Sequence, residues 1–152
     1  AKTEDTDMTF ISIVKSAALA GLIATSAAPA VADSNKIKIY QYGDGLAIGG
    51  SQSGTWNRLT ISQRGFANTS IATQDGKRNR TVVTQGGRGN DVTATQRGRC
   101  NILGVAQAGK RNKASVDQSG RCNALAVIQA GNGNKSRTVQ RGSGNVAVIV
   151  QD

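Results

Sequence analysis

The stretch QRGFANTSIAT, residues 63–73, is one copy of an eleven-residue unit that runs to the end of the chain. Its glutamine recurs every eleven residues, at Gln41, Gln52, Gln63, Gln74, Gln85, Gln96, Gln107, Gln118, Gln129, Gln140 and Gln151. Each of the first ten is followed two residues later by Gly, and nine of these ten units place Asn three residues after the Gly. Such a repeat is typical of a stacked architecture, in which each copy buries its face only against its neighbours.

The segment from the Asn to the next Gln alternates in polarity, which predicts a strand. On a strand, the Asn, the eighth position, the tenth position and the next Gln share one face. The tenth position is aliphatic in most units, as at Ile61 and Val83, so this face points inward. The recurring Gly and β-branched residues disfavour a helix. The Gln-x-Gly-x-x segment then supplies a turn, because Gly accepts a positive φ.

The size of the side chain at the tenth position alternates between successive units. One set of units carries Ile61, Val83, Val105, Val127 and Ile149, and the interleaved set carries Gly50, Ala72, Ala94, Val116 and Thr138. Large residues facing small ones let two sheets interdigitate across a thin core. The sequence therefore predicts an all-β, amyloid-like β-solenoid with 22 residues per rung, about five rungs, and a spacing of about 4.7–4.8 Å between rungs.

The inward Gln and Asn side chains require partners, since an unpaired buried amide costs roughly 1–3 kcal/mol. With identical residues one rung apart, each side-chain amide can donate to the carbonyl of a neighbouring copy and form a ladder. The first and last rungs would keep unpaired donors, acceptors and an open strand edge. We therefore expect the ends of the stack to be adhesive.

The unit, with the strings Ile39-Tyr40-Gln41-Tyr42-Gly43 and TISQRGFAN at residues 60–68, resembles curlin repeats, the subunits of bacterial curli. The resemblance covers about residues 35–152, and Leu46 departs from it by replacing the first Asn. It implies a secreted functional amyloid that polymerises head to tail into a cell-surface fimbrium for adhesion, cell aggregation and biofilm matrix, with curli-type secretion and nucleation proteins as partners. It also implies that the stacking residues are the glutamines above and Asn57, Asn68, Asn79, Asn90, Asn101, Asn112, Asn123, Asn134 and Asn145.

Two curli roles stay open at this point. The strict spacing of eleven residues resembles the minor, nucleating subunit, whereas the strings of the first repeats resemble the major subunit. We prefer the major subunit.

The residues before the repeats have the features of a secretory signal. Residues 8–32 contain Lys15, an apolar run over residues 17–24 and the cleavage pattern Ala30-Val31-Ala32. The run is shorter than the roughly 20 residues of a spanning helix. We expect an unassigned leader at 1–7, a signal peptide at 8–32, and a secreted, extracellular solenoid at 33–152 with no membrane span.

The predicted mature chain is strongly basic, with 17 Lys and Arg against six Asp, a formal charge of +11. We expect one edge of the stack to carry Lys77, Arg78, Arg97, Arg99, Arg121 and Arg141. This column could bind anionic polysaccharide or extracellular DNA in a salt-sensitive manner, or it could keep the unfolded subunit soluble. The alternative function is therefore a monomeric secreted solenoid, a binding protein or adhesin for anionic polymers. The apolar last segment, residues 146–151, argues against a capped monomer.

Cys100 and Cys122 hold the same place in the unit and lie 22 residues apart. A separation of one rung falls within the Cα distance that a disulfide tolerates. Two free thiols and a bond between subunits remain the alternatives.

The residues for catalysis are missing from the repeats. The chain has no His and no Glu after residue 4, and Asp33, Asp44, Asp75, Asp91, Asp117 and Asp152 fall at scattered positions of the unit. A facing pair of carboxylates or a set of metal ligands is therefore not expected. The sequence predicts no enzyme, no catalytic or metal residues and no cofactor.

Overall fold

The computed structural model describes residues 34–152, so the predicted leader and signal peptide lie outside the described residues. Within this range every regular element is a strand. The strands are β1 (Lys36–Asp44), β2 (Ala47–Thr55), β3 (Arg58–Phe66), β4 (Thr69–Lys77), β5 (Arg80–Arg88), β6 (Asp91–Arg99), β7 (Ile102–Lys110), β8 (Lys113–Arg121), β9 (Ala124–Asn132), β10 (Lys135–Ser143) and β11 (Val146–Gln151).

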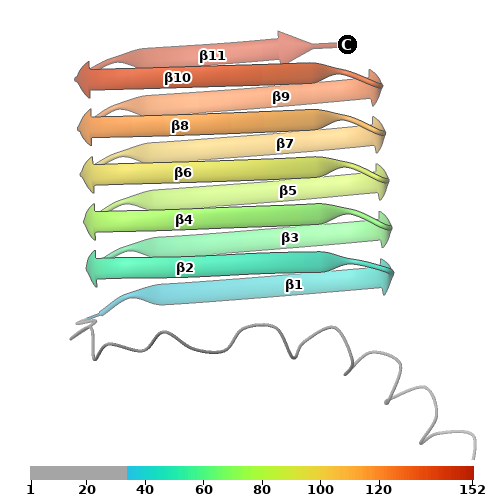
Figure 1. The fold of residues 1–152 in the computed structure, drawn as a ribbon, viewed down its shortest axis with the longest axis horizontal. Coiled ribbons are helices and arrows are strands. Elements are labelled where there is room, and N and C mark those ends of the chain that lie inside the picture. Colours follow the sequence, from blue (N-terminus) through green and yellow to red (C-terminus); the bar gives the residue numbers. More distant parts are fainter. Residues whose placement is uncertain (1–33) are drawn as a thin grey trace, which may run out of the picture.

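Consecutive strands lie in two different sheets that face each other (Figure 1). The odd-numbered strands form a six-stranded sheet and the even-numbered strands a five-stranded sheet. Neighbouring strands within a sheet are parallel, and each residue pairs with the residue 22 positions later in the sequence. Gln63 pairs in this way with Gln85, and Gln74 with Gln96. The predicted β-solenoid is confirmed. Its eleven strands, at two per rung, extend the expected five rungs by the additional strand β11.

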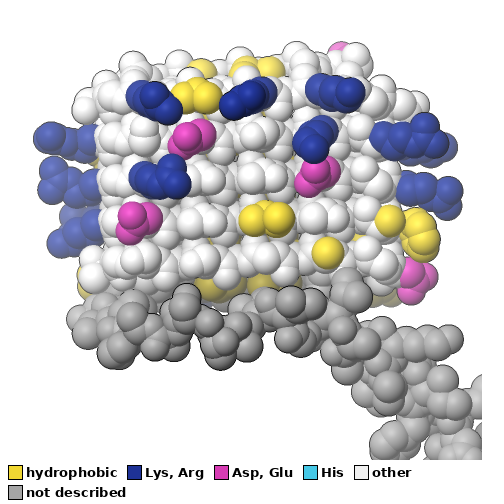
Figure 2. Space-filling view, viewed as in Figure 1, with side chains coloured by type: hydrophobic (Ala, Val, Ile, Leu, Met, Phe, Trp, Pro, Cys, Tyr) yellow, Lys and Arg dark blue, Asp and Glu magenta, His cyan; other side chains and the backbone are white. Residues whose placement is uncertain are grey.

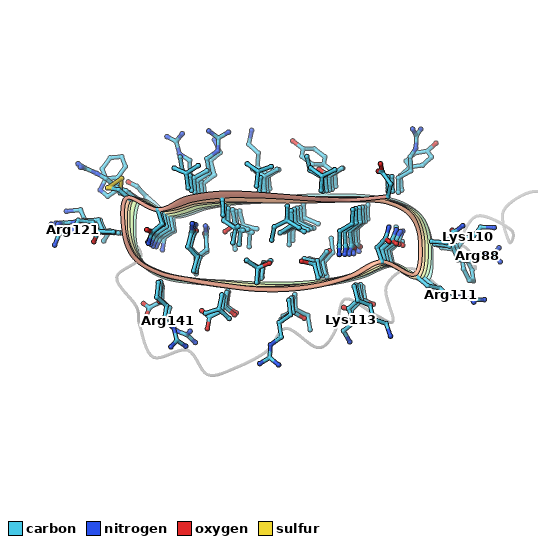
Figure 3. The ribbon with its side chains drawn as sticks, turned by 90° about the horizontal axis from the view of Figure 1, so that it is seen from above. Arg88, Lys110, Arg111, Lys113, Arg121 and Arg141 are labelled. Carbon is cyan, nitrogen blue, oxygen red and sulfur yellow. A yellow bond between two sulfur atoms is a disulfide. The ribbon has the colours of Figure 1, made fainter. Side chains whose placement is uncertain are left out.

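The core is a thin layer between the two sheets (Figure 3). Its larger members, Leu59, Ile61 and Leu103, come from the six-stranded sheet, and Ala72 and Ala94 come from the five-stranded sheet. The alternation of side-chain size along the sequence therefore becomes a difference between the two sheets, which lets them interdigitate closely.

Each turn contains two residues in the left-handed region of φ. One is the Gly of the repeat, for example Gly98 with φ 109°, and the other lies two residues later, for example Cys100 with φ 65°. A Cβ atom on Gly98 would overlap the backbone carbonyl oxygen of Gly120 on the next rung. The first of these positions was predicted from the sequence. The second was not, since residues such as Trp56 (φ 62°) occupy it.

Candidate functional site: ladders, edges and open ends

The glutamines form two continuous ladders, one along each sheet. Each Nε2 donates to the Oε1 of the glutamine one rung later, at 2.5–3.2 Å from Gln41 through Gln129. In most rungs the same Nε2 also donates across the core to a backbone carbonyl of the other sheet, as from Gln85 to Thr69 at 3.0 Å. Gln85 and Gln96 are at most 1% exposed. The ladders therefore satisfy the buried amides and join the sheets to each other.

The asparagines use a different set of bonds. Asn90 Oδ1 accepts the backbone N–H of Asn112 at 3.0 Å, and Asn90 Nδ2 donates to the carbonyls of Gly86 (2.9 Å) and Gly109 (3.1 Å). The expected amide-to-amide bond occurs between Asn123 and Asn101, at 3.2 Å. Because most of the partners are backbone groups, the asparagines hold each turn closed and fasten it to the next turn.

Asn35 belongs to this series, although the repeat count above omitted it. Its Oδ1 accepts the N–H of Asn57 at 2.8 Å, and its Nδ2 donates to Gly54 O at 2.8 Å. Its position, eleven residues before Leu46, is the signal that could have found it. Leu46 has no side-chain amide and cannot take part in these bonds. On the edge of the described solenoid that carries Leu46, the first bond of this kind therefore runs from Asn90 N–H to Asn68 Oδ1.

Hydroxyl groups at the eighth position also join the ladders. Ser70 Oγ accepts from Gln63 Nε2 at 3.0 Å and donates to Gln85 Oε1 at 2.6 Å. Thr81 bridges Gln74 and Gln96 in the same way. These polar residues stand at core positions where the pattern alone would favour an aliphatic side chain.

Comparison with known families gives the same repeat. The family model described as "Curlin associated repeat" matches residues 54–87, 65–98 and 87–120. Residues 54–120 of the chain therefore belong to the curlin repeat family. The matched windows begin at Gly54, Gly65 and Gly87, so they are in phase with the turns of the solenoid. A comparison with curated proteins finds no match.

Two curlin repeats are joined covalently at one edge of the stack. Cys100 and Cys122 form a disulfide in the structure, with their Cα atoms 4.5 Å apart. They lie in the turns that follow β6 and β8. The bond therefore links two successive rungs through their turns.

The same edge of the curlin solenoid carries a basic groove of about 610 Å³. Its lining includes the side chains of Trp56, the two cysteines and Arg58, Arg78, Arg80, Arg99 and Arg121. Arg58 and Arg80 are direct neighbours in the six-stranded sheet, and Arg99 and Arg121 are neighbours in the five-stranded sheet. Figure 3 shows Arg121 pointing outward from this turn, opposite the turn that carries Arg88, Lys110 and Arg111.

Two of the cations expected in this column lie elsewhere. Arg97 is within β6 and Arg141 within β10, so both side chains belong to the outer face of the five-stranded sheet. The residue after each repeating Gln still lies in the strand. Each strand is therefore longer, and each turn shorter, than the sequence predicted. On this face Arg97 pairs with Asp117 at 3.6 Å, and Lys113 pairs with Asp91 at 3.2 Å (Figure 2).

Within residues 34–152, both ends of the curlin solenoid carry strands with one open edge. β1 and β2 at one end, and β10 and β11 at the other, each pair with a strand on one side only. On β11, Val146, Val148 and Val150 are 77%, 65% and 62% exposed. Parallel strands ending in this way present unpaired backbone donors and acceptors to a further strand.

Residues 34–152 contain no group of three or more His, Cys, Asp or Glu side chains placed to hold a metal ion. In the same range no helix has the length and hydropathy needed to span a membrane.

Proposed function

We propose that this chain is a structural subunit of extracellular curli-like amyloid fibres, in which copies add head to tail through their end rungs. The observation that carries the proposal is the pair of open ends. The two strands at each end have one unpaired edge, which can pair with another copy as the interior strands pair with each other. The contact is heterologous and does not close, so repeated addition gives a fibre. The curlin family supports a structural role rather than an enzymatic one.

The finer assignments are part of the same proposal. Residues 8–32 act as the secretory signal, and the fibre serves adhesion, cell aggregation and biofilm matrix. The major subunit is preferred over the nucleating subunit. Curli-type secretion and nucleation proteins are the partners expected for a curlin repeat chain.

Fibre formation is tested on residues 33–152 diluted from denaturant at micromolar concentration. We expect thioflavin-positive fibres, with diffraction near 4.7 Å and 10 Å, and growth that starts without a lag once seeds are added. A chain that stays monomeric and dye-negative for days would refute the proposal.

A variant pair on β11 tests whether the open edge is the growing end. The backbone N–H groups of Arg58 and Arg80 donate to the following rung. Along a strand of a parallel sheet, the N–H groups of every second residue point toward the same neighbouring strand. Val148 lies two positions later in the unit than Arg58 and Arg80 do, so its N–H also points toward the following rung. Val148→Pro removes this donor, so we expect seeded elongation to slow at least tenfold. Val148→Thr keeps the donor and should elongate like the parent chain. Equal rates for the two variants would place growth elsewhere.

Binding of an anionic polymer is a second candidate function, and the arginine groove favours it. Guanidinium groups bind sulfate, carboxylate and phosphate through paired hydrogen bonds, and Trp56 adds a flat apolar wall. The Arg99→Gln, Arg121→Gln variant should weaken the retention of heparin several-fold and flatten its salt dependence. The matched variant Arg88→Gln, Lys110→Gln, on the opposite edge, removes the same charge. If it weakens binding equally, the attraction is to net charge and not to the groove.

A further inference from the structure

Residues 34–152 form an odd number of strands, and this number determines how a following copy can continue the stack. Each strand is related to the preceding one by a half-turn about the stack and a rise of half a rung (Figure 1). Ten such steps lead from β1 to β11, so both strands lie in the six-stranded sheet. The next strand of the spiral therefore falls in the row of the five-stranded sheet, beside β10.

We infer that consecutive subunits of the fibre are related by a half-turn about the fibre axis, so that β10 pairs with β1 and β11 with β2 of the next copy. The inference rests on the proposed fibre function and specifies its contact. The simpler stacking, translation without rotation, pairs β11 with β1. It also leaves an empty strand position between β10 and β2 of the next copy.

Gln52 distinguishes the two arrangements. Its Oε1 is buried and has no hydrogen-bond partner among the described residues. In later rungs the equivalent oxygen accepts from the glutamine 22 residues earlier, as Gln74 Oε1 does from Gln52. Twenty-two residues before Gln52 the sequence has Ala30. The half-turn brings Gln151 Nε2 of the preceding copy to this position, whereas translation leaves the oxygen facing the vacancy.

The opposite end holds the matching donors. Gln140 Nε2 and Gln151 Nε2 donate to the carbonyls of Ala124 (3.3 Å) and Lys135 (3.2 Å), respectively. Interior glutamines such as Gln107 make this bond and a second one to the next glutamine. After a half-turn the remaining N–H groups of Gln140 and Gln151 face Gln41 and Gln52 of the next copy. The donors at one end then correspond one for one to the acceptors at the other.

The turn asparagine supports the same docking. Asn123 Nδ2 donates to Ser119 O in its own turn (3.1 Å) and to Gly142 O on the next rung (2.8 Å). Asn145 Nδ2 makes the first kind of bond, to Arg141 O at 2.8 Å. The half-turn places the carbonyl of Gly43 of the next copy where the second acceptor is required.

The half-turn also brings like charges together, which makes the contact sensitive to salt. Lys135 of one copy would lie beside Lys36 of the next, and Arg137 beside Lys38. The chain already tolerates such neighbours, since Lys36 pairs with Arg58 and Lys113 with Lys135. Salt screens exposed charges, so elongation should accelerate between 20 mM and 300 mM salt. Translation would instead set valines of β11 against these lysines.

Two double-cysteine variants of residues 33–152 report on the two arrangements. Gly45 and Gly144 hold the same turn position as Cys100 and Cys122, with φ 63° and 69°, and the half-turn places them one rung apart. A Cβ on Gly45 meets only ordinary contacts, and one on Gly144 meets nothing within 4 Å. The matched variant, Lys38→Cys with Val148→Cys, joins β1 to β11 under translation.

We expect oxidised fibres of Gly45→Cys with Gly144→Cys to yield a ladder of disulfide-linked multimers on non-reducing gels, and the matched variant to yield at least tenfold less. Helical reconstruction of unmodified fibres should give a rotation near 180° and a rise of roughly 26 Å per subunit. A rise of roughly 29 Å without rotation, or the reverse pattern of crosslinks, would overturn the half-turn. So would fibres in which neither pair crosslinks. A chain that forms no fibres would refute the proposed function and, with it, this contact.

Discussion

The inward and outward positions of the solenoid follow different rules, although they alternate along the same strands. The inward Gln and Asn positions keep the same residue type from rung to rung, as in the ladder that runs from Gln63 to Gln85. Outward positions change freely, from Ile102 and Gly104 on β7 to Lys135 and Arg137 on β10. An inward side chain lies between the inward side chains of the rungs before and after it, so that any change is felt by two neighbouring rungs. The fold is therefore specified inside, and charge and partner contacts can vary outside.

We expect the largest loss of stability from Gly98→Ala. The new Cβ would overlap the carbonyl oxygen of Gly120, and φ 109° is itself unfavourable for Ala. We expect a loss of at least about 4 kcal/mol in the free energy of unfolding, measured from urea transitions on unassembled protein. Gly104→Ala, on the outer face with nothing within 4 Å, is the control and should change it by less than about 0.5 kcal/mol. Similar losses for the two variants would contradict the steric account.

Adjacent residues of β7 provide a sharper pair. Leu103 is 1% exposed in the core and Ile102 is 55% exposed on the outside. Leu103→Ala should cost about 3–4 kcal/mol, because it removes buried methyl groups and leaves a cavity in a thin core. Ile102→Ala should cost less than about 1 kcal/mol. The midpoint of urea unfolding checks both, and a loss for Ile102→Ala that matches the Leu103 value would mean that this outer face is covered.

The sequence predicts the inside of this molecule better than its turns and ends. Glutamine spacing and the alternation of Ile61 with Ala72 specify strands, rung length and which sheet carries the larger residues, because stacking repeats one local environment. The asparagine bonds were less predictable, since their partners are mostly backbone carbonyls that only the closed turn brings near. The prediction that Arg97 lies in a turn was wrong. The length of a strand depends on how far it pairs with the next rung, and the repeat pattern alone does not show this. The role of Gln52 Oε1 in the proposed contact between subunits could not be predicted from the repeat pattern. It depends on the number of strands, which only the complete fold shows.

The disulfide tests whether an outward feature can stabilise the fold as much as an inward one. Cys100 and Cys122 close a segment of 22 residues between successive rungs. Replacing both by Ser should cost about 3 kcal/mol, mainly by freeing the unfolded chain. Reducing agent should lower the stability of the parent chain to that of the variant and leave the variant unchanged. If reduction changes neither protein, the bond contributes nothing measurable to stability.

The smallest effect is expected at the ion pair on the outer face of the five-stranded sheet. Lys113 Nζ lies 3.2 Å from Asp91, with the two side chains 61% and 39% exposed. Exposed pairs of this kind contribute about 0.2–1 kcal/mol. Lys113 also neighbours Lys135 in the sheet, so Lys113→Ala removes a repulsion together with the attraction. We therefore expect a net change below about 0.5 kcal/mol, and a double-mutant cycle with Asp91→Ala would isolate the attraction. A coupling above about 1 kcal/mol that persists in 1 M salt would show that this outer position is specified as strictly as the core.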